Sequence, residues 1–316
     1  MPLRIVPYLK GLLSVAESAT CTALSLVVKE TSHDNLSRIL KEPKFRWQTL
    51  LRTLGLRIFG KLSDGWLIID DTVIDKSFAR QIENLSWIYC SKKQRSVLGL
   101  NLVLLCWSNG TITIPLAFKV WKKEGKKSKF DLALELLSYA RNVLQIRPKY
   151  ITFDSWYASK KILKRLRKYR WIFYSQLKRN RIFNGVQVSQ YGRTRYFTEQ
   201  GIIFGDFKVL VVKHGGKYFV TNNLKCSKSE LLAAYKTRWV IETLFRILHN
   251  KLGLGQCQSR SLQCQSAHIS LCLMSLLILE RAKIDSGKTH YQLRREFTFH
   301  PELVNQSLFK LNLVSA

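Results

Sequence analysis

The sequence has few acidic residues and few prolines. Its 21 Asp and Glu stand against 52 Lys and Arg, which gives a formal net charge of +31, and the basic residues are spread along the whole chain. A polyanion is therefore the natural partner of the folded protein. With 6 Pro and 46% hydrophobic residues in a chain of 316, the composition argues against a disordered chain. It predicts a globular protein with a large core and more than one folded unit.

Membrane spans, a secretion signal and a cysteine framework are not evident either. The longest apolar stretch, near residues 269–279, is shorter than the roughly 20 residues that cross a bilayer, and we expect a buried helix there. The first residues lack a long apolar run and a cleavage site, so we expect a cytoplasmic protein with no membrane partner. Seven cysteines at irregular spacing predict reduced thiols. Cys257, Cys264 and His268 lie near one another but lack a C-x-x-C pair, so we expect no zinc site.

Hydrophobic periodicity divides the chain into helical and strand-rich parts. Residues 1–62 read as a small helical domain, whose Arg46, Arg52 and Arg57 suit either phosphate contact or simple solvation. From Trp66 to about residue 184 the pattern predicts the order β-β-β-α-β-α-β. Short strands and glycine turns in 185–222 indicate a β-rich insertion. Helices return in 223–284, and 285–316 is left as a C-terminal tail. The predicted class is α/β.

Carboxylates follow two of the predicted buried strands. "LIIDDT" supplies Asp70 and Asp71, and "YITFDSWY" supplies Asp154. Each acid alone reads equally well as a cap or turn residue. Together they indicate a site, because functional side chains gather at strand ends, and carboxylates are the ligands that Mg²⁺ prefers.

A third acid lies in the segment "AAYKTRWVIETLFRILHNK", residues 233–251, which reads as one helix. At about 100° per residue, Tyr235, Arg238, Glu242 and His249 share an arc of about 60°. An S-x-x-E capping box at Ser227 predicts where the helix begins. The stripe is either a solvated face or a polar face directed at a site.

These segments resemble the DDE transposases of bacterial insertion sequences, in the group marked by a Y-(2)-R-(3)-E-(6)-K helix. The resemblance covers roughly Trp66 to Leu279, and "IIDDT", "FDSWY" and "YKTRWVIE" occur in the expected order. The last position holds His249 instead of Lys, with Lys251 two residues beyond. The resemblance implies an RNase H-like catalytic domain in two parts, 63–184 and 223–284. The β-rich insertion 185–222 precedes the last acid. We expect the helical domain 1–62, which lies outside the resemblance, to bind DNA.

The resemblance also implies an activity and roles for particular residues. Asp70, Asp154 and Glu242 are expected to be catalytic and to bind two Mg²⁺ ions, which Mn²⁺ can replace; Asp71 is the alternative to Asp70. Phosphate contacts are expected from Tyr235, Arg238 and either His249 or Lys251. The expected reaction is DNA strand cleavage and strand transfer at the ends of an insertion sequence. The partners are then element ends and target DNA, with a dimer when two ends are synapsed, at the bacterial nucleoid.

A basic helix after Asp154 is a further candidate DNA contact. We expect its side chains to follow the DNA backbone, although a solvated face explains them too; they are Lys160, Lys161, Lys164 and Arg165. Two other functions stay open: a catalytically inactive, domesticated DNA-binding regulator, and an RNase H-like nuclease without strand transfer.

Overall fold

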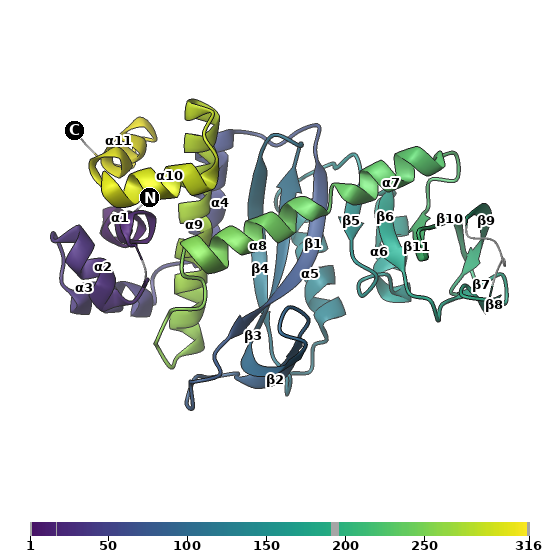
Figure 1. Ribbon diagram of the computed structural model, residues 1–316, viewed down its shortest axis with the longest axis horizontal. Coiled ribbons are helices and arrows are strands. Elements are labelled where there is room, and N and C mark those ends of the chain that lie inside the picture. Colours follow the sequence, from purple (N-terminus) through teal and green to yellow (C-terminus); the bar gives the residue numbers. More distant parts are fainter. Residues whose placement is uncertain (1, 17, 191–195, 315–316) are drawn as a thin grey trace.

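A computed structural model describes residues 2–16, 18–190 and 196–314 (Figure 1). Both chain termini lie at one end of the molecule, among helices, and a large sheet extends from there to the other end. The N-terminal helices are η1 (Leu3–Ile5), α1 (Val6–Ser14), α2 (Cys21–Val28), α3 (His33–Lys41) and α4 (Trp47–Phe59). Side chains of Thr20 and Ser32 cap α2 and α3, as expected of hydroxyl residues at helix starts.

The centre of the sheet follows the predicted strand order with one addition. Its strands are β1 (Trp66–Asp75), β2 (Ser86–Cys90), β3 (Arg95–Ser108), β4 (Thr113–Trp121), β5 (Ile151–Phe153) and β6 (Phe173–Leu177). β1 is antiparallel to β3 and parallel to β5, which is parallel to β6. The sequence prediction omits β2, a short strand beside the outer part of β3. Trp87 and Tyr89 of β2 are exposed, so the strand has no clear buried face for a pattern to reveal.

The strands predicted as an insertion over 185–222, together with one short strand just before it, continue the same sheet. They are β7 (Ile182–Phe183), β8 (Val186–Gln187), β9 (Phe197–Ile203), β10 (Phe207–His214) and β11 (Lys217–Thr221). β11 pairs antiparallel with β6, and β10 and β9 follow outward. The described part of the chain thus forms one sheet of eleven strands. The predicted span 185–222 also contains residues 191–195, which lie outside the described residues.

Helices cover the two faces of this sheet. α5 (Lys129–Asn142) and α6 (Lys160–Tyr169) pack together on one face. α7 (Lys228–Lys236) and α8 (Trp239–Lys251) lie on the other, and α8 crosses in front of the sheet in Figure 1. Side chains of β11 alternate between the two faces of the sheet. Phe219 packs under α7, whereas Tyr218 and Val220 belong to the larger hydrophobic core.

The long helix α9 (Leu262–Ser286) joins the sheet to the terminal helices. It has the length and composition of a membrane span, yet most of it is buried inside the fold, as expected of a core helix. It packs against α1, α3, α4 and β4. After it come α10 (His290–Phe299) and α11 (Glu302–Lys310). The segment 285–316, which the sequence leaves as a tail, therefore contains the two helices α10 and α11. The domain boundaries stay predictions.

The predicted single helix over 233–251 is wrong, because the chain forms two. The capping box at Ser227 is confirmed at the start of α7. α7 ends at Lys236, and the Thr237 hydroxyl donates to the Ala234 carbonyl at 2.6 Å, which competes with the helical backbone pattern. Arg238 then becomes the residue that precedes α8. Periodicity does not reveal such a break, since Thr237 keeps a helical conformation.

One buried side chain fastens the two ends of the chain together. Arg294 of α10 is 4% exposed and donates to the carbonyl of Lys251 at 2.9 Å and to those of Leu13 and Val15. Three backbone carbonyl oxygens thus stabilise the buried guanidinium charge in place of water.

We predict that Arg294→Ala lowers the free energy of unfolding by about 3 kcal/mol, because buried carbonyls lose their donor. Denaturant unfolding measures this. The neighbouring exposed Arg295 is the control, and Arg295→Ala should change the same quantity by less than about 0.5 kcal/mol. Equal unfolding midpoints for the two variants would contradict the proposed role of Arg294.

Candidate active site

Two of the predicted acids are neighbours across β1 and β5. The parallel register pairs Ile69 with Phe153, so the next position places Asp70 beside Asp154. Paired positions on adjacent strands project to the same face of a sheet. Both carboxylates therefore belong to the face covered by α7 and α8.

Arg238 connects this pair to the third acid. Its Nη1 donates to Oδ2 of Asp70 at 2.7 Å, and its Nη2 donates to Oε1 of Glu242. The Arg238 and Asp70 side chains are 13% and 15% exposed. Glu242 lies in the first turn of α8, where the helix dipole favours a negative charge. Strand β1 and the start of α8 thus meet around one guanidinium group.

Burial dominates the electrostatics of the two aspartates. It raises the pKa of Asp70 to about 7, and Asp154 and Asp71 add to that rise, although Arg238 opposes it. The pKa of Asp154 is also raised, chiefly by burial, even though its carboxylate accepts the backbone N–H of Trp156 at 2.8 Å. Crowded, buried carboxylates of this kind gain from a nearby cation.

Asp71 projects to the other face and is fully engaged there. Its oxygens accept hydrogen bonds from Asn101 Nδ2 at 2.7 Å, from Lys129 Nζ at 2.9 Å and from the Tyr157 hydroxyl at 2.9 Å. Within the pair, the geometry therefore favours Asp70 as the acid that faces Glu242. The sequence analysis missed Asn101 and Lys129, because only the fold brings β3 and α5 next to Asp71. Tyr157 was within reach of sequence reasoning, since it belongs to "FDSWY".

The remaining residues of the signature occupy different surroundings. Tyr235 lies 5.7 Å from the Arg238 guanidinium, and its hydroxyl donates to Gln176 at 3.3 Å. His249 Nε2 is 3.0 Å from the Thr72 hydroxyl, and burial lowers its pKa to about 4. His249 is therefore neutral at neutral pH, which disfavours the imidazolium alternative. Lys251 is not brought to the acids; its ammonium lies over the Tyr291 ring.

The basic helix α6 lies on the opposite face from α8. Lys161 pairs with Asp131 at 3.3 Å, and Arg165 contacts the Tyr169 hydroxyl at 3.2 Å. Lys160 and Lys164 are exposed. Lys160 and Lys164 are therefore accessible to a polyanion, whereas Lys161 and Arg165 are engaged within the protein. The structure does not place the four side chains with the three acids.

Metal binding requires a rearrangement. Among the described residues, no three His, Cys, Asp or Glu side chains converge closely enough to hold a metal ion. Arg238 stands between Asp70 and Glu242, so both acids can bind one ion only if Arg238 moves. Of the residues considered for zinc, His268 has both ring nitrogens engaged, by the Tyr8 hydroxyl and the Gly253 carbonyl. The absence of a zinc site stays a prediction.

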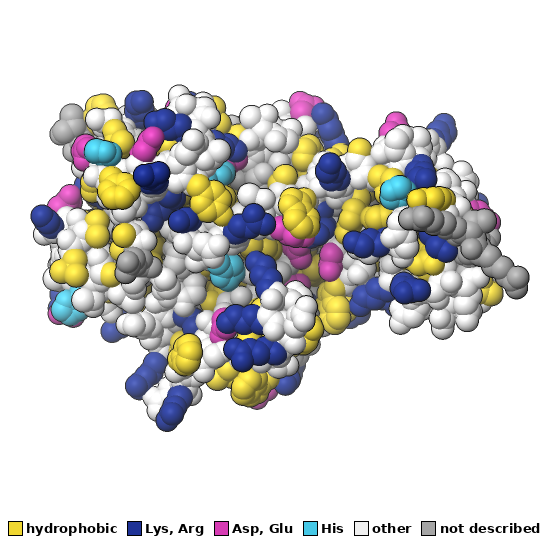
Figure 2. All heavy atoms as spheres, viewed as in Figure 1, with side chains coloured by type: hydrophobic (Ala, Val, Ile, Leu, Met, Phe, Trp, Pro, Cys, Tyr) yellow, Lys and Arg dark blue, Asp and Glu magenta, His cyan; other side chains and the backbone are white. Residues whose placement is uncertain are grey.

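Figure 2 shows the face that carries α8. A few acidic side chains lie at its centre, below α8, and Lys and Arg side chains surround them at a distance. In this distribution the Lys and Arg side chains can bind most phosphates of a polyanion, while one phosphate lies beside the central acidic side chains.

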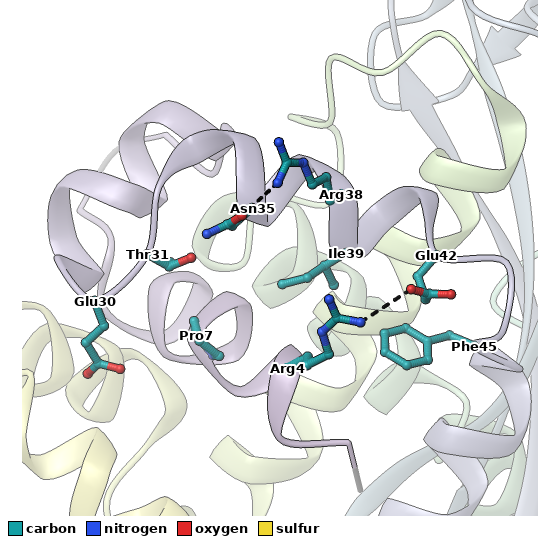
Figure 3. Close-up of a pocket in the computed structure, with 9 residues that line it drawn as sticks. All are labelled: Arg4, Pro7, Glu30, Thr31, Asn35, Arg38, Ile39, Glu42 and Phe45. Atoms are coloured by element: carbon teal, nitrogen blue, oxygen red, sulfur yellow. Dashed lines mark hydrogen bonds and ion pairs between the residues drawn. The ribbon is translucent and has the colours of Figure 1, made fainter.

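A separate cleft of about 320 Å³ lies among the N-terminal helices (Figure 3). Arg4 pairs with Glu42 at 3.6 Å across it, and Arg38 donates to Asn35 at 3.4 Å. Of the arginines singled out in this region, Arg57 is engaged within the protein, since it donates to the Asn312 carbonyl. A DNA-binding role for 1–62 stays a prediction.

Comparison with known proteins identifies the family. Residues 62–278 match the transposase DDE domain family, and this chain belongs to it. Among solved structures, the piggyBac transposase synaptic complex with hairpin DNA is similar in fold. Its TM-score is 0.58 at 13% identity, over 95% of this chain and 70% of that chain. No curated protein matches this chain. The resemblance to DDE transposases is confirmed at the level of the family, whereas the insertion-sequence group stays a prediction.

The raised pKa of Asp70 predicts a pH-dependent stability of the metal-free protein. An unfolded Asp titrates near pH 4, and the folded acid near 7. The fold thus favours the protonated form, and its contribution to stability is lost as pH rises from about 4 to about 7. The Asp70→Asn variant has no carboxyl group here, so it should not lose this stability. The difference in unfolding free energy, variant minus wild type, should therefore increase from about pH 4 to about pH 7 and stay constant at higher pH.

Denaturant unfolding at a series of pH values, with a chelator present, measures the effect. Asp64→Asn is the control, because Asp64 is exposed; its difference from wild type should stay flat. Parallel curves for wild type and Asp70→Asn would show that the fold does not favour protonated Asp70.

Proposed function

We propose that this chain is a transposase of bacterial insertion sequences that cleaves DNA strands at the ends of the element and transfers them to target DNA. The observation that carries the proposal is that Asp154 lies beside Asp70 on one face of the sheet, and that Arg238 joins Asp70 to Glu242. We assign residues 63–184 and 223–284 to an RNase H-like catalytic domain. The order β4-β3-β1-β5-β6, with β1 parallel to β5, supports this assignment.

The acids have the chemistry that Mg²⁺ requires. They supply carboxylate oxygens from β1, from the end of β5 and from α8, and hard divalent cations prefer such donors. The guanidinium between Asp70 and Glu242 supports the fit, because the space already stabilises positive charge. Two bound Mg²⁺ ions, or Mn²⁺ in their place, would activate the attacking oxygen and stabilise the leaving oxygen of an in-line displacement at phosphorus.

The protein's own side chains would position the DNA. Arg238 presents a planar fork that suits two phosphate oxygens, and it becomes available when it releases the carboxylates. Tyr235 lies beside it, within reach of the same phosphate. Neutral His249 would donate a hydrogen bond to phosphate from Nε2, the ring nitrogen that lies beside the Thr72 hydroxyl. Lys251 is less suitable because of its place over Tyr291.

DNA is the proposed partner, both as element ends and as target. The net charge of +31 supports this, and the piggyBac structure, which is similar in fold, is described as a synaptic complex with hairpin DNA. We further propose a dimer when two ends are synapsed and a location at the bacterial nucleoid. Joined product distinguishes this function from that of a nuclease, and cleavage distinguishes it from that of an inactive DNA-binding regulator.

We predict that Asp154→Ala and Glu242→Ala each abolish Mg²⁺-dependent strand cleavage while DNA affinity changes little, because each removes a metal ligand and leaves the basic surface intact. Gel assays on DNA that brackets this reading frame measure cleavage, joining and binding. Asp71→Asn tests the choice within the pair and should retain more activity than Asp70→Asn. Normal cleavage by Asp154→Ala would refute the proposed triad.

A second prediction concerns the fork of Arg238. Arg238→Lys keeps a positive charge near Asp70 and Glu242 but loses the planar fork, so we expect cleavage to slow by about a hundredfold on pre-bound DNA. Thermal unfolding checks that the variant is folded. Arg246→Lys is the matched control, because Arg246 is exposed on the same helix. If both variants cleave at the wild-type rate, Arg238 has no role in positioning phosphate.

A further inference from the structure

A second polar groove lies at the far end of β1 from the acids. It has a volume of about 770 Å³ and is formed where the loop after β1 meets the loop after α8. In Figure 1 these two loops lie side by side at the lower left. Its lining includes Lys76, Arg80 and Arg260 beside Gln81, Gln256 and Gln258. The acidic residue in the lining, Asp75, forms an ion pair with Lys93. Among the described residues, neither Arg80 nor Arg260 forms an ion pair with a carboxylate. Their charges are therefore available to an anionic ligand.

A buried lysine holds the two loops together. Lys76 is 8% exposed, and its ammonium donates to the carbonyls of Gly255 at 2.7 Å and Cys257 at 2.5 Å. At the other end of the first loop, the Glu83 N–H donates to the Arg260 carbonyl at 2.8 Å. The Glu83 carboxylate in turn accepts the Leu262 N–H at 2.8 Å. These contacts within the protein thus preform the groove.

Phe78 projects from this fastened loop with its side chain fully exposed. Single exposed apolar residues are common and need no explanation by themselves. Phe78 differs because it lines a groove with two uncompensated arginines and several amides. This combination suits duplex DNA, where Arg and Gln contact phosphates and the minor groove while an apolar wedge enters between base pairs.

The groove and the acids lie along one side of β1. Three residues of this side contact different parts of the fold: Asp70 contacts Arg238, Thr72 contacts His249, and Lys76 contacts the loop after α8. They alternate along the chain with residues that point to the other face. Lys76 follows the last residue of β1 and lies six residue steps from Asp70, a length of about 20 Å in an extended chain. A duplex rises about 3.4 Å per base pair, so this length corresponds to about six base pairs.

We propose that this groove binds duplex DNA about six base pairs from the phosphate at the acids. Phe78 enters between two base pairs from the minor groove, and Arg80 and Arg260 hold the flanking phosphates. The inference rests on the proposed function and extends it to a second contact. The duplex is either the element end or the target, which share this chemistry.

The test uses the full chain without Mg²⁺, so that the DNA stays intact. Duplexes carry 2-aminopurine, which fluoresces when unstacked, at single positions four to eight base pairs from the cleavage point. One set copies the DNA that brackets this reading frame, and the other is unrelated target duplex. Wild type should raise the fluorescence near the sixth base pair, in whichever set occupies the groove. Phe78→Ala should abolish the rise, and Phe78→Leu should largely preserve it.

Salt titration tests the arginines separately. Arg80→Ala with Arg260→Ala should weaken binding about tenfold and make the log-log salt slope shallower by about 2, since each phosphate contact contributes about 0.9. Phe299→Ala is the control for Phe78→Ala, because Phe299 is 69% exposed on α10; it should leave fluorescence unchanged. Thermal unfolding confirms that each variant is folded.

The outcomes separate the two proposals. If wild type binds DNA but shows no rise at any position, and the double variant keeps the wild-type slope, the groove proposal is overturned and the proposed function stands. If wild type binds neither duplex, both proposals fail.

Discussion

The ion pairs from Arg238 to Asp70 and Glu242 are the interaction on which the site depends. Burying carboxylates beside one another is costly unless a cation is supplied, and this structure supplies it from the residue that precedes α8. The pairs also fix how α8 crosses β1. The same carboxylates cannot be fully bound by Arg238 and by a metal ion at once. In the proposed function, metal binding would therefore be linked to the release of Arg238, and the released guanidinium is the group that would meet the substrate phosphate.

The break between α7 and α8 makes this arrangement possible. α7 packs on β5, β6 and β11, whereas α8 packs on β1 and β4, so the two helices serve different parts of one twisted sheet. The Thr237 hydroxyl bond to Ala234 marks the junction. Arg238 and Glu242 then lie at the start of α8, one turn apart, where both can reach the end of the β1–β5 pair.

The division of the sheet into two faces separates two kinds of function. On the α8 side, β1 presents Asp70, Thr72 and Lys76 in succession, and the proposed DNA path follows them. On the other side, Asp71 joins β1, β3, α5 and the loop after β5 through three hydrogen bonds. Consecutive aspartates thus have different surroundings because successive strand residues point to opposite faces.

The predicted end of the first strand at the acids is wrong, because β1 continues to Asp75 and both Asp70 and Asp71 lie within it. The sequence by itself determined the strand before Asp154, the capping box at Ser227, the buried character of 269–279 and the resemblance to DDE transposases. These are local properties, set by periodicity and by residue type at short spacing. Only the tertiary structure distinguished the surroundings of Asp70 from those of Asp71, since these depend on the β1–β5 register and on the position of Arg238. It also decided the break at Thr237 and the continuation of the sheet through β11. It placed α6 on the face away from the acids. Contacts between residues far apart in the chain set each of these features, and no local pattern records such contacts.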